Sequence, residues 1–133
     1  MNDLLLQAAS DIAIFLNTHL PEQAENWWKT HVEDRLSYQQ QRMVHERGFT
    51  TLKQLDFAAL IRVFDQNWYE LSQTLNLPRE GRNWIKELQT VRNKWAHMST
   101  EVMEVSEIYR DIDTLSRFLK MIDSSPESIA VVE

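Results

Sequence analysis

Apolar residues recur along this chain at steps of three and four, the spacing that places side chains on one face of an α-helix. The clearest stripe consists of Phe57, Leu60, Ile61, Phe64, Trp68, Leu71 and Leu75. Asp56 precedes it as a helix cap, and Pro78 follows it as a helix breaker. The pattern therefore predicts one continuous helix over residues 56–75.

The segments before this stripe carry weaker helical signals. A first helix is predicted over residues 3–19, with Asn2 as its cap. Residues 22–47 are compatible with one helix or a broken pair, because the polar middle interrupts the apolar spacing. Gly48 is expected to end this segment, as glycine does at helix C-termini.

Two further helices are predicted after Pro78, over residues 79–97 and 105–122. The apolar positions of the last helix are Val105, Ile108, Ile112, Leu115, Leu119 and Ile122. No segment alternates as a half-buried strand does. The predicted fold is an all-α bundle of four or five helices, formed by a single domain over residues 1–122, with residues 123–133 as a tail or the start of a linker.

Composition removes several classes of function. The chain has no cysteine, which excludes disulfides, thiolate metal ligands and a cysteine nucleophile. Its two glycines are isolated, so no phosphate-cradling glycine loop is present, and the histidines show no metal-ligand spacing. Neither a metal nor another cofactor is expected. The opening residues lack the basic region of a signal peptide and no apolar run reaches membrane-spanning length, so a cytoplasmic protein is expected.

Charge is distributed unevenly along the chain. The formal net charge of −6 disfavours non-specific binding to nucleic acid. Residues 79–97 nevertheless carry five basic side chains against two acidic ones, whereas residues 98–133 carry three against eight. If nucleic acid binds, the basic helix over residues 79–97 is the expected place.

Winding this basic helix at 100° per residue separates two faces. Its polar stripe consists of Arg79, Arg82, Lys86, Gln89, Asn93 and His97. Arg92 falls instead beside Leu88 and Ile85, on the flank of the apolar face. An arginine there must pair with a carboxylate, extend its head to solvent or line an interface.

Arg92 and His97 are residue types suited to phosphodiester chemistry, since arginine offers fixed donors to phosphate oxygens and histidine exchanges a proton near neutral pH. On an ideal helix they lie about 140° apart. Either the helix unwinds near His97, or two copies of the chain meet so that both pairs face one groove. The second arrangement predicts a homodimer with a composite site.

Structural roles compete with these functional ones. His97 also suits a cap near the helix C-terminus, and Arg92 also suits a salt bridge with Glu107 or Asp111. The tryptophans at 68, 84 and 95 are expected to be packing residues. Of Trp27 and Trp28, which cannot share one helix face, one is expected to be exposed at a partner surface.

Several stretches together resemble the HEPN superfamily and, within it, the Swt-type branch. The family motif is an arginine, four to six residues and a histidine, matched here by Arg92 and His97, with Asn93 in the polar position that follows the arginine. The supporting stretches are residues 55–68, Leu77-Pro78, residues 91–97 and residues 109–115. The resemblance covers about residues 50–120.

This resemblance implies a helical bundle that dimerises through its motif helices and, in active members, cleaves RNA without a metal. His97 would then be the general acid or base, Arg92 would stabilise charge on the phosphoryl oxygens, and Asn93 would hold His97 or a phosphate oxygen. RNA-backbone contacts are assigned to Arg82, Lys86 and Lys94.

Three functions follow from the resemblance. The first is an RNA-binding domain, a metal-independent endoribonuclease in phage defence, a toxin–antitoxin pair or RNA quality control. The second is a non-catalytic dimerisation or interaction domain at the N-terminus of a larger ATPase- or nuclease-containing protein, which the net acidity favours. The third is one half of a two-gene pair, in which an antitoxin would be the partner.

Overall fold

The computed structural model describes residues 2–96 and 104–122, and this part of the chain forms helices and no strand. The principal helices are α1 (Asn2–His19), α2 (Tyr38–Arg47), α3 (Phe57–Gln66), α4 (Trp68–Leu75), α5 (Glu80–Ala96) and α6 (Val105–Met121). Short helical turns, η1 (Leu20–Glu22), η2 (Trp28–Val32), η3 (Glu33–Arg35) and η4 (Leu52–Gln54), connect them. The all-α prediction is confirmed, and α1 begins at Asn2 itself, one residue earlier than predicted.

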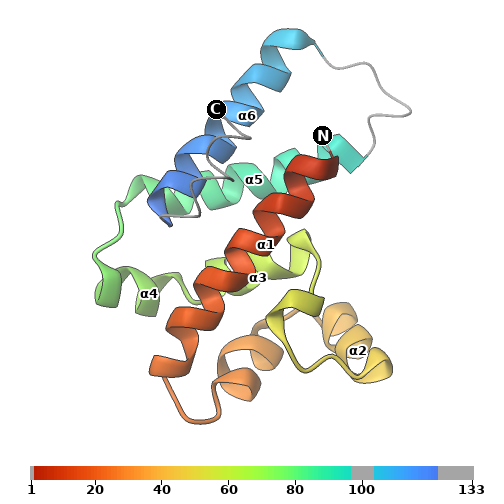
Figure 1. The fold of residues 1–133 in the computed structure, drawn as a ribbon, viewed down its shortest axis with the longest axis vertical. Helices are drawn as coiled ribbons and strands as arrows, with labels where there is room; N and C mark the ends of the chain where they lie inside the picture. The colour runs from red at the N-terminus through yellow and green to blue at the C-terminus, as the bar shows by residue number, and fades with distance from the viewer. Residues whose placement is uncertain (1, 97–103, 123–133) are drawn as a thin grey trace.

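Helix α3 lies at the centre of the bundle, with α1 along one side and α5 along another, and α5 in turn packs against α6 (Figure 1). The fully buried ring of Phe64 on α3 marks the middle of the core. Its centroid lies 5.2 Å from that of Phe15 on α1 and 5.5 Å from that of Phe118 on α6. These contacts join three helices far apart in sequence, which fixes how α3 presents its outer face to α2 and α5.

The predicted continuous helix over residues 56–75 is wrong, because the chain breaks at Asn67 between α3 and α4. The Asn67 side chain is fully buried, and its Nδ2 donates to the carbonyl oxygens of Val63 (2.7 Å) and His31 (2.8 Å). An asparagine amide that competes for helix carbonyls interrupts the regular ladder. The cap at Asp56 is confirmed, since its Oδ1 accepts from the Ala59 amide at 2.9 Å.

Residues 20–36 form short 3₁₀ and π-helical turns, and a regular helix returns only at α2. Of the two alternatives for residues 22–47, the broken one is therefore correct. Ser37 begins α2 through a capping box with Gln40, in which the Ser37 side chain accepts from the Gln40 amide and the Gln40 side chain accepts from the Ser37 amide. Gly48 ends α2 with φ of 64°, as predicted for a left-handed C-terminal residue.

The apolar stripe of α6 is shifted from its prediction. Val105 is 66% exposed, whereas Phe118, which lies outside the predicted stripe, is fully buried against Phe64. The shift arises because an undistorted helix repeats every 3.6 residues, so a strict seven-residue stripe drifts around it. Trp27 and Trp28 are both partly buried against the core, so the expected exposed member of the pair is not found.

Candidate functional site

Helix α5 carries the motif and is held on two sides. Pro78 precedes its first turn, and its buried residues are Gly81, Ile85, Leu88, Val91 and Trp95. These residues face α3 and α6, the two helices against which α5 packs. Trp95 is buried as predicted, and its Nε1 donates to Asp111 Oδ2 at 3.2 Å. Arg92 and Asn93 therefore sit on a backbone fixed by the core.

Arg92 is partly buried and makes no ion pair with any described residue. Its Nη1 donates to Asn93 Oδ1 at 3.3 Å. The predicted salt bridge from Arg92 to Glu107 or Asp111 is wrong, because Lys94 occupies both carboxylates. Helix α6 lies on the side of α5 that Lys94 faces, and Lys94 and Arg92 point in directions about 160° apart around the helix.

Lys94 is instead part of an ion-pair cluster between α5 and α6. Its Nζ lies 3.0 Å from Glu107 Oε1 and 2.9 Å from Oδ2 of the buried Asp111. Burial by itself lowers the pKa of Lys94, but the hydrogen bonds and charges of Asp111 and Glu107 outweigh it and hold the pKa above its ordinary value. The cluster fixes the last turns of α5 against α6.

Arg82 and Lys86, the other residues assigned to the RNA backbone, share one carboxylate. Arg82 Nε lies 3.3 Å from Asp65 Oδ1, and Lys86 Nζ lies 2.8 Å from Asp65 Oδ2. The Asp65 side chain is only 4% exposed, whereas both cations are about half exposed. They stand on the surface with part of their charge neutralised, on the same helix as Arg92.

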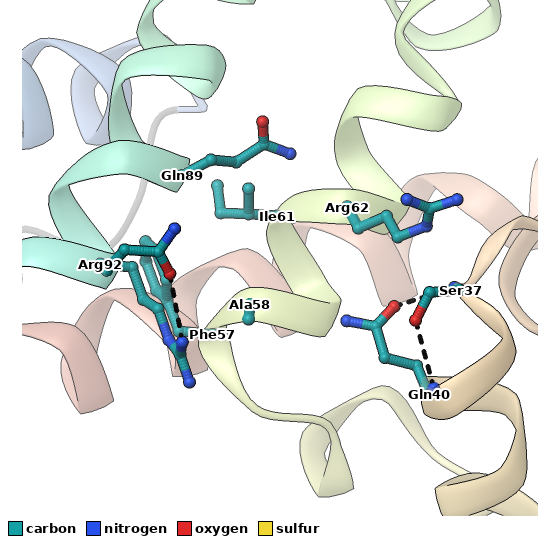
Figure 2. Close-up of a pocket in the computed structure, with 9 residues that line it drawn as sticks. Ser37, Gln40, Phe57, Ala58, Ile61, Arg62, Gln89 and Arg92 are labelled. Atoms are coloured by element: carbon teal, nitrogen blue, oxygen red, sulfur yellow. Dashed lines mark hydrogen bonds between the residues drawn. The ribbon is translucent and has the colours of Figure 1, made fainter. Parts of the chain in front are cut away.

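A hollow of about 220 Å³ opens where α2, α3 and α5 meet. We call it the α2–α3–α5 hollow. It is lined by Ser37, Gln40, Phe57, Ala58, Ile61, Arg62, Gln89, Arg92 and Asn93. Figure 2 shows Arg92 at one end and Arg62 near the other, with Ala58 and Ile61 of α3 between them. None of the lining residues is acidic.

A second hollow, of about 550 Å³, lies on the α1 side of Arg92. It is more apolar and is lined by Leu5, Leu6, Ala9, Ser10, Lys53, Leu55, Asp56, Phe57 and Arg92. Arg92 and Phe57 line both hollows and so form the ridge between them. The guanidinium of Arg92 can therefore contact a ligand that approaches from either side.

His97 lies outside the described residues, so its distance from Arg92 and its expected role as a helix cap are not assigned. Helix α5 remains α-helical through Ala96, the residue before it. Arg92 and Asn93 thus sit on regular helix, and Asn93 is exposed beside the α2–α3–α5 hollow. Over residues 2–96 and 104–122, no three histidine, aspartate or glutamate side chains come together in a way that suits a metal ion.

The sequence did not single out Gln40 or Arg62 as site residues. Neither lies near the motif in sequence. Arg62 reaches the hollow because α3 packs against α5, and Gln40 reaches it from the first turn of α2. One signal was available, since Arg62 follows the buried Leu60 and Ile61 on a helix with an otherwise apolar face. An arginine at that edge of a core helix packs its stem on apolar surface and extends its charged head outward, where a ligand can reach it.

Comparison with known proteins gives one match. Residues 4–123 match the family described as Swt1-like HEPN. The match extends to the N-terminal residues, for which the sequence motifs gave no assignment. No curated protein and no solved structure matches the chain. In the part of the chain that the structure describes, no helix is both long and apolar enough to span a membrane.

Proposed function

The chain belongs to the Swt1-like HEPN family, and from that premise we propose that it is a metal-independent endoribonuclease whose site contains Arg92, Asn93 and His97. The family assignment supports a general RNase-like, RNA-binding domain. Cleavage and the assignment of these three residues go beyond it and are our proposal.

One observation carries the proposal: Arg92 is an arginine without a carboxylate partner among the described residues, beside a hollow with no acidic lining. Lys94, Arg82 and Lys86 on the same helix are all ion-paired. A guanidinium held beside the core and not neutralised is available for the bidentate hydrogen bonds that it forms with phosphate oxygens.

The chemistry uses the ribose of the RNA as the nucleophile. The 2′-hydroxyl loses its proton to a base, its oxygen bonds to the adjacent phosphorus, and the bond from phosphorus to the 5′-oxygen breaks. The departing 5′-oxygen takes a proton from an acid. His97 serves as the base or as the acid, Arg92 stabilises the negative charge that builds on the phosphoryl oxygens, and Asn93 positions His97 or the phosphate.

This reaction needs two proton transfers, and one histidine performs one of them at a time. A second copy of the chain would supply the other His97, in a composite site at a dimer interface. A composite site brings an arginine and a histidine to one groove even though residues five apart on an ideal helix face directions about 140° apart. Homodimerisation through the motif helices is part of the proposal.

The products test this chemistry. Attack by the 2′-oxygen leaves a 2′,3′-cyclic phosphate on one fragment and a 5′-hydroxyl on the other. An RNA with a single 2′-deoxyribose at the scissile position should remain uncut there. Fragments with a 5′-phosphate would indicate attack by water and would exclude this mechanism.

A non-catalytic interaction domain is the second candidate. It is favoured by Leu6 and Ile14 on α1, which are 70% and 51% exposed. Exposed apolar side chains mark a partner surface when they belong to one contiguous patch, and this candidate function requires that of Leu6 and Ile14. If a correctly folded dimer cleaves no RNA, the interaction domain becomes the favoured function and the ribonuclease is abandoned. Substitution of Leu6 and Ile14 by glutamine should then abolish partner binding.

A further inference from the structure

The lining of the α2–α3–α5 hollow differs from the rest of the described surface. The other three basic residues of α5, Arg82, Lys86 and Lys94, are ion-paired, whereas Arg92 on α5 and Arg62 on α3 have no ion pair with a described residue. Both line this hollow, and none of the nine lining residues is acidic, in a protein whose net charge is −6. The hollow is therefore a local concentration of positive charge that suits an anionic ligand.

Two of its donors are held in place by other bonds. Arg62 Nε donates to the Arg35 carbonyl oxygen at 2.9 Å, which fixes the guanidinium and leaves its Nη groups without a partner among the described residues. Gln40 Oε1 accepts from the Ser37 amide at 3.0 Å in the capping box, which leaves Nε2 as a donor with no described acceptor. Donors fixed before binding lose little entropy when a ligand arrives.

The remaining surface of the hollow suits the rest of a nucleotide. Phe57, Ala58 and Ile61 form an apolar floor, and Gln89 and Asn93 on α5 add neutral polar groups at the rim. A base or ribose can lie against such a floor while amide side chains meet its polar edge. Its volume of about 220 Å³ falls below the ~300–1,000 Å³ of pockets for drug-sized ligands, which indicates one small unit of a longer molecule.

We propose that the α2–α3–α5 hollow binds the nucleotide next to the scissile phosphate of a single-stranded RNA. Arg62 and Gln40 bind the phosphate of that nucleotide, Phe57 supports its base or ribose, and Arg92 at the opposite end binds the scissile phosphate. Arg62 and Gln40 are thus binding residues of the same site and not catalytic residues. The inference rests on the proposed function, because it names the place of the substrate beside the proposed reaction.

The sharpest test is a pair of isosteric substitutions on α2. Gln40→Glu keeps the acceptor that binds the Ser37 amide, so the capping box and the fold are retained, but it replaces the free donor by a negative oxygen. Gln39→Glu makes the same change of charge at the exposed neighbouring position, outside the hollow. A second pair removes one positive charge: Arg62→Gln in the hollow, and Arg47→Gln on the exposed end of α2 as its control.

The measurement is fluorescence anisotropy of the full chain with a labelled single-stranded RNA whose ribose 2′-hydroxyls are methylated, so that it cannot be cleaved. Gln40→Glu and Arg62→Gln should each raise Kd about tenfold, while Gln39→Glu and Arg47→Gln should stay within about twofold of wild type. Arg62→Gln should also reduce the slope of log K against log salt by about 0.7, the value for one lost phosphate contact on a single strand.

Equal affinities for Gln40→Glu and Gln39→Glu, together with equal affinities for Arg62→Gln and Arg47→Gln, would overturn the inference and leave the proposed ribonuclease unaffected. The opposite outcome can also be distinguished. If the Gln40→Glu and Arg62→Gln variants lose affinity but the wild-type protein does not cleave unmodified RNA, the RNA-binding subsite is supported and the proposed ribonuclease activity is overturned. A wild-type chain that does not bind the methylated RNA overturns the subsite and RNA recognition together.

Discussion

Lys94 Nζ lies 2.9 Å from the carboxylate of the buried Asp111, whereas Arg92, two residues earlier on the same helix, has no carboxylate partner among the described residues. The two cations point to opposite sides of α5. Lys94 joins α5 to α6, and Arg92 lines the hollows beside α1, α2 and α3. The motif helix therefore uses one cation for its own attachment and leaves the other without a carboxylate among the described residues.

This difference predicts unequal effects on RNA binding. Arg92→Gln should raise the Kd for non-cleavable RNA about tenfold, because it removes a charge-assisted bond to phosphate. Lys94→Gln should raise it by no more than about threefold, because the charge of Lys94 is already balanced by Glu107 and Asp111. Anisotropy titrations at one salt concentration compare the two variants, and a larger effect at Lys94 would reverse the assignment.

The raised pKa of Lys94 predicts a pH dependence of stability. The folded state binds this proton more tightly than the unfolded state, so the contribution of Lys94 is complete below its ordinary pKa of 10.5 and is lost as pH rises through the higher folded value. Above pH 10.5, the free energy of unfolding in urea should fall more steeply for wild type than for Lys94→Met. Lys53→Met, which removes a lysine without a described ion pair, should keep the wild-type slope.

The burial of Asp65 predicts that its ion pairs stabilise the fold more than the ion pair of an exposed carboxylate does. Asp65→Asn weakens the bonds to Arg82 and Lys86 and should lower the free energy of unfolding by about 1–3 kcal/mol. Asp113→Asn is the matched control, since its pair with Arg117 is 61% exposed on both sides and should contribute less than about 0.5 kcal/mol. Urea denaturation of the two variants measures both values, and equal losses would mean that Asp65 is not an anchor.

At Gly81, the close packing of α4, α5 and α6 leaves no room for a larger side chain. A Cβ at this buried position would collide with Cη2 of Trp68 and with Sδ of Met121. Gly81→Ala should therefore lower the free energy of unfolding by about 1 kcal/mol, since overpacking outweighs the gain in helix propensity. Thr90→Ala, at an exposed position of the same helix, should be neutral or stabilising in the same thermal melt. A more stable Gly81→Ala would show that Met121 moves aside without cost.

The long helices were predictable because their apolar stripes and end signals are local. Asp56 and Gly48 act as the sequence indicates, and α5 begins at Glu80, one residue after its predicted start. The break at Asn67 was not predictable in the same way, because its buried amide is satisfied by the backbone of His31, 36 positions earlier. A polar residue on the apolar face was the only local sign of it.

The site was predictable in part. The motif led to α5, but the roles of its cations depend on which neighbours they face. Lys94 and Arg92 look equivalent in sequence, and only the positions of α6 and α3 separate an ion-paired residue from a free one. Arg62 and Gln40 enter the site through packing between helices that no local pattern specifies. Tertiary contacts thus decide which basic residues remain without a carboxylate partner.

The most direct test is cleavage of unmodified single-stranded RNA by the purified chain in excess EDTA. Wild type should cleave, and Arg92→Ala and His97→Ala should each lose about 10²-fold or more in rate. Arg47→Ala and His45→Ala, which remove the same residue types from the exposed end of α2, should cleave at the wild-type rate. Absence of cleavage by folded wild-type protein, or cleavage that persists in both Arg92→Ala and His97→Ala, would contradict the account.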